Sequence, residues 1–210
     1  MVEMAARRAP AIANTAWLKP LPPATRFSFY GDAGARAAAA AVWGGEFSEE
    51  ACRAHAHSTR ATLWLGPDEY LLLDFAAGAP GAAPGATGAA SASAGSPPDD
   101  AHAAAELAAA LERALGTLPH SLVDISHRQF ALEVSGPHAA AILNGACPLD
   151  LDIGEFPIGM CTRTVLAKAD IVLWRTDEDT FHLEVWRSFA GYVTGILSEI
   201  AAEFYPRSGA

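Results

Sequence analysis

Apolar and polar side chains alternate most regularly in the last third of the chain, where three consecutive strands are predicted. The strands cover residues 161–167, 170–175 and 180–185. In the last of them Phe181, Leu183 and Val185 share one face, because successive side chains of a strand point to opposite sides. The first two strands are predicted to form a hairpin that turns at Lys168 and Ala169.

Two other segments have the spacing of apolar positions that is typical of an amphipathic helix. Residues 105–116 end at Gly116, which suits a helix end, and residues 186–204 precede Tyr205-Pro206, where the helical conformation is disfavoured. The apolar stripes consist of Leu107, Leu111 and Leu115 in the first helix and of Phe189, Val193, Leu197, Ile200 and Phe204 in the second. Each helix is therefore predicted to pack on one face.

The segment before residue 76 contains only two clear strands. Residues 61–65 and 70–75 predict a hairpin, since residues 66–69 (GPDE) supply the proline and aspartate of a tight turn. The alanine-rich residues 33–43 fit either a short helix or part of a loop.

Two further strands and a helix are predicted in the middle of the chain. Residues 120–126 and 128–136 have the composition of strands, and a helix follows between Pro137 and Gly145. Mostly antiparallel strands interrupted by packing helices predict an α+β fold. We expect residues 1–210 to form one domain.

Residues 76–104 interrupt that pattern. They contain only Ala, Gly, Pro, Ser, Thr, Asp and one His, which is too little apolar surface to offset the entropy lost on ordering. The segment is predicted to be a flexible insertion within the domain.

Charge and composition exclude several classes of protein. The net charge is −10, with no basic block, which argues against a nucleic-acid partner. No window of 18 residues is continuously apolar and the first 20 residues lack an unbroken apolar stretch, so we expect a cytoplasmic protein with no membrane span. Cys52, Cys147 and Cys161 lack CxxC spacing and predict reduced thiols rather than a zinc site. Neither a phosphate-binding loop nor a dinucleotide fingerprint is present.

Two histidine motifs are candidates for metal or acid–base chemistry. His182 and Glu184 share one face of their strand, but we favour a solvated, alternating strand face over a functional pair. His55 and His57 have the same spacing, and without a third ligand nearby they are weak evidence for a metal site.

The run VDISHR brings Asp124, Ser126 and His127 together. A catalytic triad is improbable here, because neighbouring residues of a strand point to opposite faces. We expect a buried polar strand end whose side chains hold the neighbouring loop.

A cysteine and a set of large side chains are further candidates for function. Cys161 lies near Arg163, and a cation can lower a thiol pKa, although a small buried thiol is the more common case. Trp174, Trp186 and Arg187 belong to the residue types that dominate interface energies. The two tryptophans fit the core of this domain equally well, so both interpretations stay open.

Four long runs of sequence carry a family resemblance over most of residues 58–204 outside the insertion. They are TLWLGPDEYLLL (62–73), LVDISHRQFALEVSGPHAAAILNGACPLDLD (122–152), FPIGMCTRTVLAKADIVLWR (156–175) and FHLEVWRSFAGYVTGIL (181–197). These runs resemble the gamma subunit family of heterotetrameric sarcosine oxidase. The resemblance implies a fold like the folate-binding domain of the glycine-cleavage aminomethyltransferase.

The resemblance also implies a function. The complex would be a bacterial oxidoreductase that demethylates sarcosine to glycine with oxygen and passes the one-carbon unit to tetrahydrofolate. FAD, FMN, NAD and tetrahydrofolate would belong to the partner alpha, beta and delta subunits. This chain would be an accessory subunit with no catalytic, cofactor-binding or metal-binding residue of its own. Trp174, Trp186 and Arg187 would hold the assembly together.

Two alternatives remain. The first is a free-standing folate-binding protein, similar to the iron–sulfur-assembly factor with a K-G-C-Y-x-G-Q-E motif. The corresponding residues 158–163 (IGMCTR) keep only the cysteine of that motif. The second is an independent hydrolase that uses Ser126, His127 and Cys161.

Overall fold

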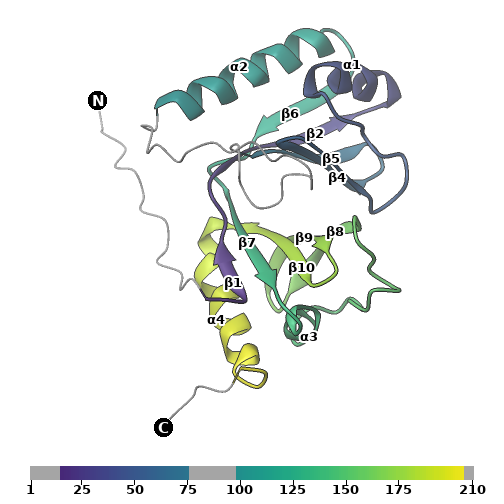
Figure 1. Cartoon of the computed structure of the whole chain (residues 1–210). Helices are drawn as coiled ribbons and strands as arrows, with labels where there is room; N and C mark the ends of the chain where they lie inside the picture. The colour runs from purple at the N-terminus through teal and green to yellow at the C-terminus, as the bar shows by residue number, and fades with distance from the viewer. Residues whose placement is uncertain (1–14, 76–97, 206–210) are drawn as a thin grey trace.

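Two five-stranded antiparallel sheets form the centre of the protein (Figure 1). The structure is a computed structural model that describes residues 15–75 and 98–205. One sheet has the strand order β1-β7-β10-β9-β8 and the other has the order β3-β4-β5-β2-β6. The predicted α+β fold is thereby confirmed.

The elements follow one another as strands with interspersed helices. The strands are β1 (Leu18–Pro20), β2 (Ala24–Gly31), β3 (Ala54–His57), β4 (Arg60–Gly66), β5 (Glu69–Phe75), β6 (His120–Asp124), β7 (Gln129–Ser135), β8 (Cys161–Leu166), β9 (Ala169–Asp177) and β10 (Thr180–Trp186). The helices are α1 (Ala33–Trp43), α2 (Pro98–Leu115), α3 (Ala139–Asn144), the 3-10 helix η1 (Arg187–Phe189) and α4 (Ala190–Ala201).

The two halves of the chain repeat the same order of elements. A strand, a helix, three strands and a helix appear as β2-α1-β3-β4-β5-α2 and again as β7-α3-β8-β9-β10-α4. The strand before each repeat joins the sheet of the other repeat, because β1 pairs with β7 and β6 pairs with β2. This exchange of strands links the two sheets.

The sheets pack face to face, and each is covered on its outer side by helices (Figure 1). Alternation along the strands sends one set of side chains to the helices and the other set to the facing sheet. The core between the sheets consists of Ala61, Leu63, Leu71, Leu73, Phe75, Ile125, Cys161, Val172 and Trp174. Polar side chains that point the same way must therefore find partners between the sheets.

The sequence located the later elements better than the earlier ones. The predicted hairpin is β4 and β5, and residues 33–43 form a helix that is capped by Asp32 and ended by Gly44 in the left-handed conformation (φ 76°). Strands β1, β2 and β3 were not predicted. Two of them are only 3 and 4 residues long, too short for a periodic pattern.

Two predicted boundaries need correction. Residues 98–104 belong to α2 and are not part of a flexible insertion. The rest of the predicted insertion, residues 76–97, lies outside the described residues, as do residues 1–14. The closing helix begins with η1 rather than at Trp186, and Phe189 is exposed instead of packing in the apolar stripe.

Candidate functional site

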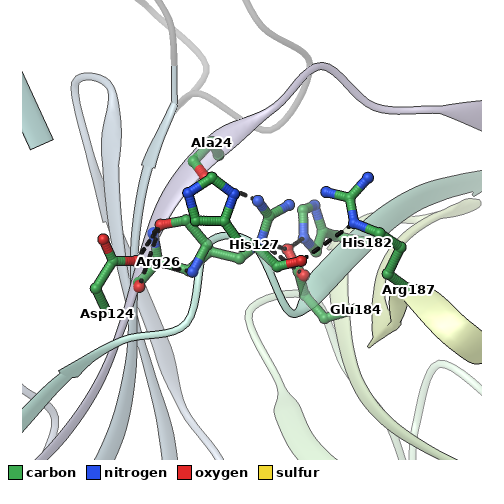
Figure 2. Close-up of polar contacts among 8 residues, drawn as sticks. Ala24, Arg26, Asp124, His127, His182, Glu184 and Arg187 are labelled. Carbon is green, nitrogen blue, oxygen red and sulfur yellow. Dashed lines mark hydrogen bonds and ion pairs between the residues drawn. The ribbon is translucent and has the colours of Figure 1, made fainter. Parts of the chain in front are cut away.

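A buried charged cluster lies between the two sheets. Strand β10 directs His182 and Glu184 toward the other sheet, where β2 presents Arg26 (Figure 2). All three side chains are buried, and Glu184 is 0% exposed. The prediction of a solvated strand face is therefore wrong. The apolar side of β10 faces the helices, and its polar side faces a second sheet instead of water.

The cluster is centred on the carboxylate of Glu184. Arg26 Nε donates to Oε1 at 3.0 Å and to Oε2 at 2.8 Å, and His182 Nε2 lies 2.8 Å from Oε1 (Figure 2). Burial by itself would raise the pKa of Glu184, but the charge of Arg26 and the hydrogen bond from His182 outweigh it and lower the pKa. Glu184 therefore stays ionised within the protein.

The contact with Glu184 orients the ring of His182. Its Nε2 is the ring nitrogen that donates to the carboxylate, because an ionised carboxylate only accepts, while its Nδ1 has no hydrogen-bond partner among the described residues. Within residues 15–75 and 98–205 no group of three or more His, Cys, Asp or Glu side chains could hold a metal ion.

Asp124 of the VDISHR run lies on the side of Arg26 away from Glu184 (Figure 2), and its contacts with Ser126 stabilise a turn. Asp124 Oδ1 accepts hydrogen bonds from the backbone N and the Oγ of Ser126, at 2.8 and 2.6 Å. Ser126 Oγ in turn accepts from the backbone N of Arg26 at 2.9 Å. The predicted role in holding the loop is confirmed, but Asp124 and His127 are exposed and not buried.

Cys161 is a buried thiol and not an activated one. Its Sγ donates to the carbonyl of Trp64 at 3.5 Å, and burial raises its pKa to about 12. Arg163 is bonded to the carboxylate of Glu69 instead. A thiol that stays protonated at neutral pH is a poor nucleophile, which removes one of the three residues on which the hydrolase alternative depends.

The second histidine motif lies at the edge of a sheet. His55 and His57 are both exposed on β3, and Glu46 Oε2 is 3.8 Å from His55 Nδ1. One weak ion pair does not amount to a ligand set.

The three predicted interface residues have different environments. Trp174 is 4% exposed and packs between the sheets, so its assignment to an interface with another chain is corrected to this domain's own core. Trp186 is 43% exposed, with the Arg128 guanidinium 5.5 Å from its ring centroid. Arg187 is half-buried and donates from Nε to the carbonyl of His127 at 3.1 Å.

Sequence reasoning missed Arg26, the partner on which the buried cluster depends. Arg26 is 158 positions from Glu184, and nothing in the local pattern of either strand connects them. The one available signal is an arginine in the strand-like run ATRFSFYG, on the face opposite Phe27 and Phe29.

Comparisons of sequence identify relatives of the chain. A family described as the sarcosine oxidase gamma subunit family matches residues 98–203. The chain is 33% identical to sarcosine oxidase subunit gamma of Corynebacterium sp. (strain P-1), over 69% of this chain and 58% of the relative. It is 32% identical to the same subunit of an Arthrobacter species, over 83% of this chain and 72% of the relative. The match thus spans less than two thirds of the Corynebacterium protein.

Comparisons of structure agree with this result. A chain of heterotetrameric sarcosine oxidase from Corynebacterium sp. U-96 in complex with pyrrole 2-carboxylate matches with a TM-score of 0.71 and 26% identity, over 92% of this chain and 87% of that one. Glycine cleavage system aminomethyltransferase T from Bartonella henselae shares the fold, with a TM-score of 0.56 at 14% identity, over 86% of this chain and 44% of the other. This chain belongs to the sarcosine oxidase gamma subunit family.

Proposed function

We propose that this chain is a structural subunit of a sarcosine oxidase complex and takes no part in the chemistry. The observation that carries the proposal is the similarity of 92% of the chain to a chain of a heterotetrameric sarcosine oxidase. The buried polar groups support the structural part of the proposal. Arg26, His182 and Glu184 are engaged with one another, and Cys161 is held as a neutral thiol.

The proposal includes the partners and their chemistry. Larger subunits, alpha and beta, and a smaller delta subunit would carry FAD, FMN, NAD and the tetrahydrofolate site, and the assembly would oxidise the CH–NH bond of sarcosine in the cytoplasm. This chain would contribute Trp186 and Arg187 to the contact with them. No helix among the described residues is long and apolar enough to span a membrane.

The folate-binding alternative finds little support between the sheets. The cavity there has a volume of about 60 Å³. Sites for small-molecule ligands and cofactors usually measure roughly 300–1,000 Å³, so this cavity is too small for a molecule the size of a folate.

The test is purification of the affinity-tagged chain, co-expressed with the other sarcosine oxidase subunits of its own organism. We expect flavin-bearing larger chains to co-purify and the assembly to consume oxygen when sarcosine is added. The chain expressed alone should show no flavin absorbance and no sarcosine-dependent peroxide. A lone chain that does show both would contradict the structural role, and a tagged chain that retains no larger subunit would contradict the assembly.

A further inference from the structure

A small cavity opens between the two sheets beyond the end of the buried charged cluster. We call it the inter-sheet cavity, and its volume of about 60 Å³ has room for a few water molecules or the end of one side chain. Its wall includes Ile125, Arg128, Gln129, Val172, Glu184 and Trp186. Glu184 already receives hydrogen bonds from Arg26 and His182, so the remaining polar groups of the wall decide what the cavity can bind.

Gln129 belongs to the wall of this cavity and carries a buried acceptor without a partner. The side chain is 6% exposed, and its Oε1 has no hydrogen-bond partner among the described residues. Gln129 lies directly opposite Trp186 in the β7–β10 ladder, so the two side chains share the face that lines the cavity. Its Oε1 is almost inaccessible as the side chain lies, and a half-turn of the terminal amide, which exchanges Oε1 with Nε2, would present it to the cavity. Because buried polar groups are normally paired, the occupant of the cavity should carry a group that hydrogen-bonds to this amide.

Trp186, which lines the cavity, is followed along the chain by two more exposed aromatic side chains. We define the aromatic patch as Trp186, Phe189 and Tyr192, which are all exposed at the end of β10 and the start of α4. Phe189 and Tyr192 meet edge to face, with ring centroids 6.2 Å apart. Tryptophan and tyrosine next to arginine are the composition of the energetically dominant part of a protein interface.

The charge next to the aromatic patch is opposite to that of the whole chain. Arg128 and Arg187 are next to Trp186 of the aromatic patch. Neither arginine forms an ion pair with a carboxylate among the described residues. The chain as a whole carries −10. Two unpaired arginines on an acidic protein complement carboxylates on a partner.

A macromolecular partner accounts for these features better than a small ligand. The cavity holds one small polar group, whereas the aromatic patch beside it is an extended surface that only a second chain would cover. The usual arrangement at such a surface is one anchoring side chain in a pocket, surrounded by contacts that exclude water.

We propose that the inter-sheet cavity is an anchor pocket for the partner subunit. An amide-bearing side chain of the partner enters it and exchanges hydrogen bonds with the terminal amide of Gln129. The partner surface covers the aromatic patch and places carboxylates against Arg128 and Arg187. This inference rests on the proposed function, because it requires the larger subunits of a sarcosine oxidase complex as the partner.

The test uses competition within the assembled complex. A tagged variant and an untagged wild-type chain are co-expressed at equal levels with the other subunits, and their ratio in the purified complex gives the change in affinity. Gln129→Leu keeps the volume of the side chain and removes the acceptor, and Trp186→Ala removes the lip of the cavity. Ile158→Ala is the control, since Ile158 is an exposed apolar residue in the loop before β8.

We expect both Gln129→Leu and Trp186→Ala to be incorporated at least about tenfold less than wild type, and Ile158→Ala to be incorporated equally. The lone Gln129→Leu chain should melt at the wild-type temperature or above it, because an unpaired buried acceptor has been removed. Equal incorporation of Gln129→Leu would show that water alone serves Gln129 and would overturn the anchor pocket. If the wild-type chain captures no larger subunit, the proposed function fails and the anchor pocket fails with it.

Discussion

The two ends of the inner face of β10 have opposite environments. His182 and Glu184, at the beginning of the strand, are buried among partners, whereas Trp186, two residues further on, is 43% exposed. The alternation of the strand is the same at both ends. What differs is the opposing element, because β2 provides Arg26 at one end and the inter-sheet cavity opens at the other.

Polar and aromatic side chains have different roles at the two ends of this strand. At the closed end every charge is neutralised within the chain, which stabilises the packing of the two sheets. At the open end the amide of Gln129, two arginines and three exposed aromatic rings form, on our proposal, the contact with another chain.

The largest effect is expected at the closed end. Glu184→Ala leaves Arg26 buried without its partner, which should lower the free energy of unfolding by about 3–5 kcal/mol. Replacing both residues, with Arg26→Met and Glu184→Leu, should restore most of that loss, because no charge is then left unpaired. Chemical denaturation of the lone chain measures both. A double variant that is less stable than Glu184→Ala would show that the pair is needed for its charge.

Replacing the two tryptophans should change the stability of the chain by different amounts. Trp174→Ala should lower the free energy of unfolding by about 3–5 kcal/mol, as expected for a large buried side chain. Trp186→Ala should lower it by about 1 kcal/mol or less, the value of an exposed cation–π contact with Arg128. Denaturation curves of the two variants give the comparison, and similar losses would place Trp186 in the core.

Arg187 should affect association and not folding. Arg187→Ala removes one half-buried hydrogen bond to the His127 carbonyl, so the melting temperature should be nearly unchanged. Association with the larger subunits should weaken by at least about 1 kcal/mol. Thermal melting of the lone chain and competition in the complex measure the two quantities. A lower melting temperature with unchanged assembly would show that Arg187 stabilises the fold and does not contact a partner.

The smallest effect concerns a second histidine–glutamate pair, which unlike His182–Glu184 lies at the surface. A hydrogen bond to the Leu118 carbonyl and another to Glu112 raise the pKa of His120 above its ordinary value of 6.5. Because the folded-state pKa is the higher one, the stabilisation is complete below the unfolded pKa and is lost as pH rises through the folded pKa.

Stability measured from about pH 5 to pH 9 should therefore fall more for wild type than for His120→Gln across that window. A difference between the two proteins that does not change with pH would mean that His120 titrates with the same pKa in the folded and unfolded states.

The two ends of β10 differ in what could be predicted from the sequence. Trp186 and Arg187 could be predicted as interface residues from residue type alone, because aromatic and arginine side chains are the common anchors of interfaces, and that assignment stays a prediction. The burial of Glu184 could not, since alternation shows which residues share a face but not what covers that face. In this fold the polar face meets Arg26 of another sheet, a contact across 158 positions that the face-to-face packing of the two sheets brings about.

Prediction of the fold from the sequence had similar limits. Strands with a long apolar run, such as β9, or a long alternating run, such as β10, were predicted within a few residues, as was the end of α2 at Gly116, where φ is 54°. Short strands such as β1 and β3 carry too few residues for a pattern and are defined by their pairing partners.

Hydrogen exchange compared between the lone chain and the assembled complex tests the central claim most directly. If the open end of β10 is the contact with the larger subunits, backbone amides of residues 187–192 should gain protection on assembly. The amides of His182 and Glu184, already paired in the centre of a sheet, should not change. Unchanged exchange at residues 187–192, with new protection elsewhere on the chain, would contradict the account.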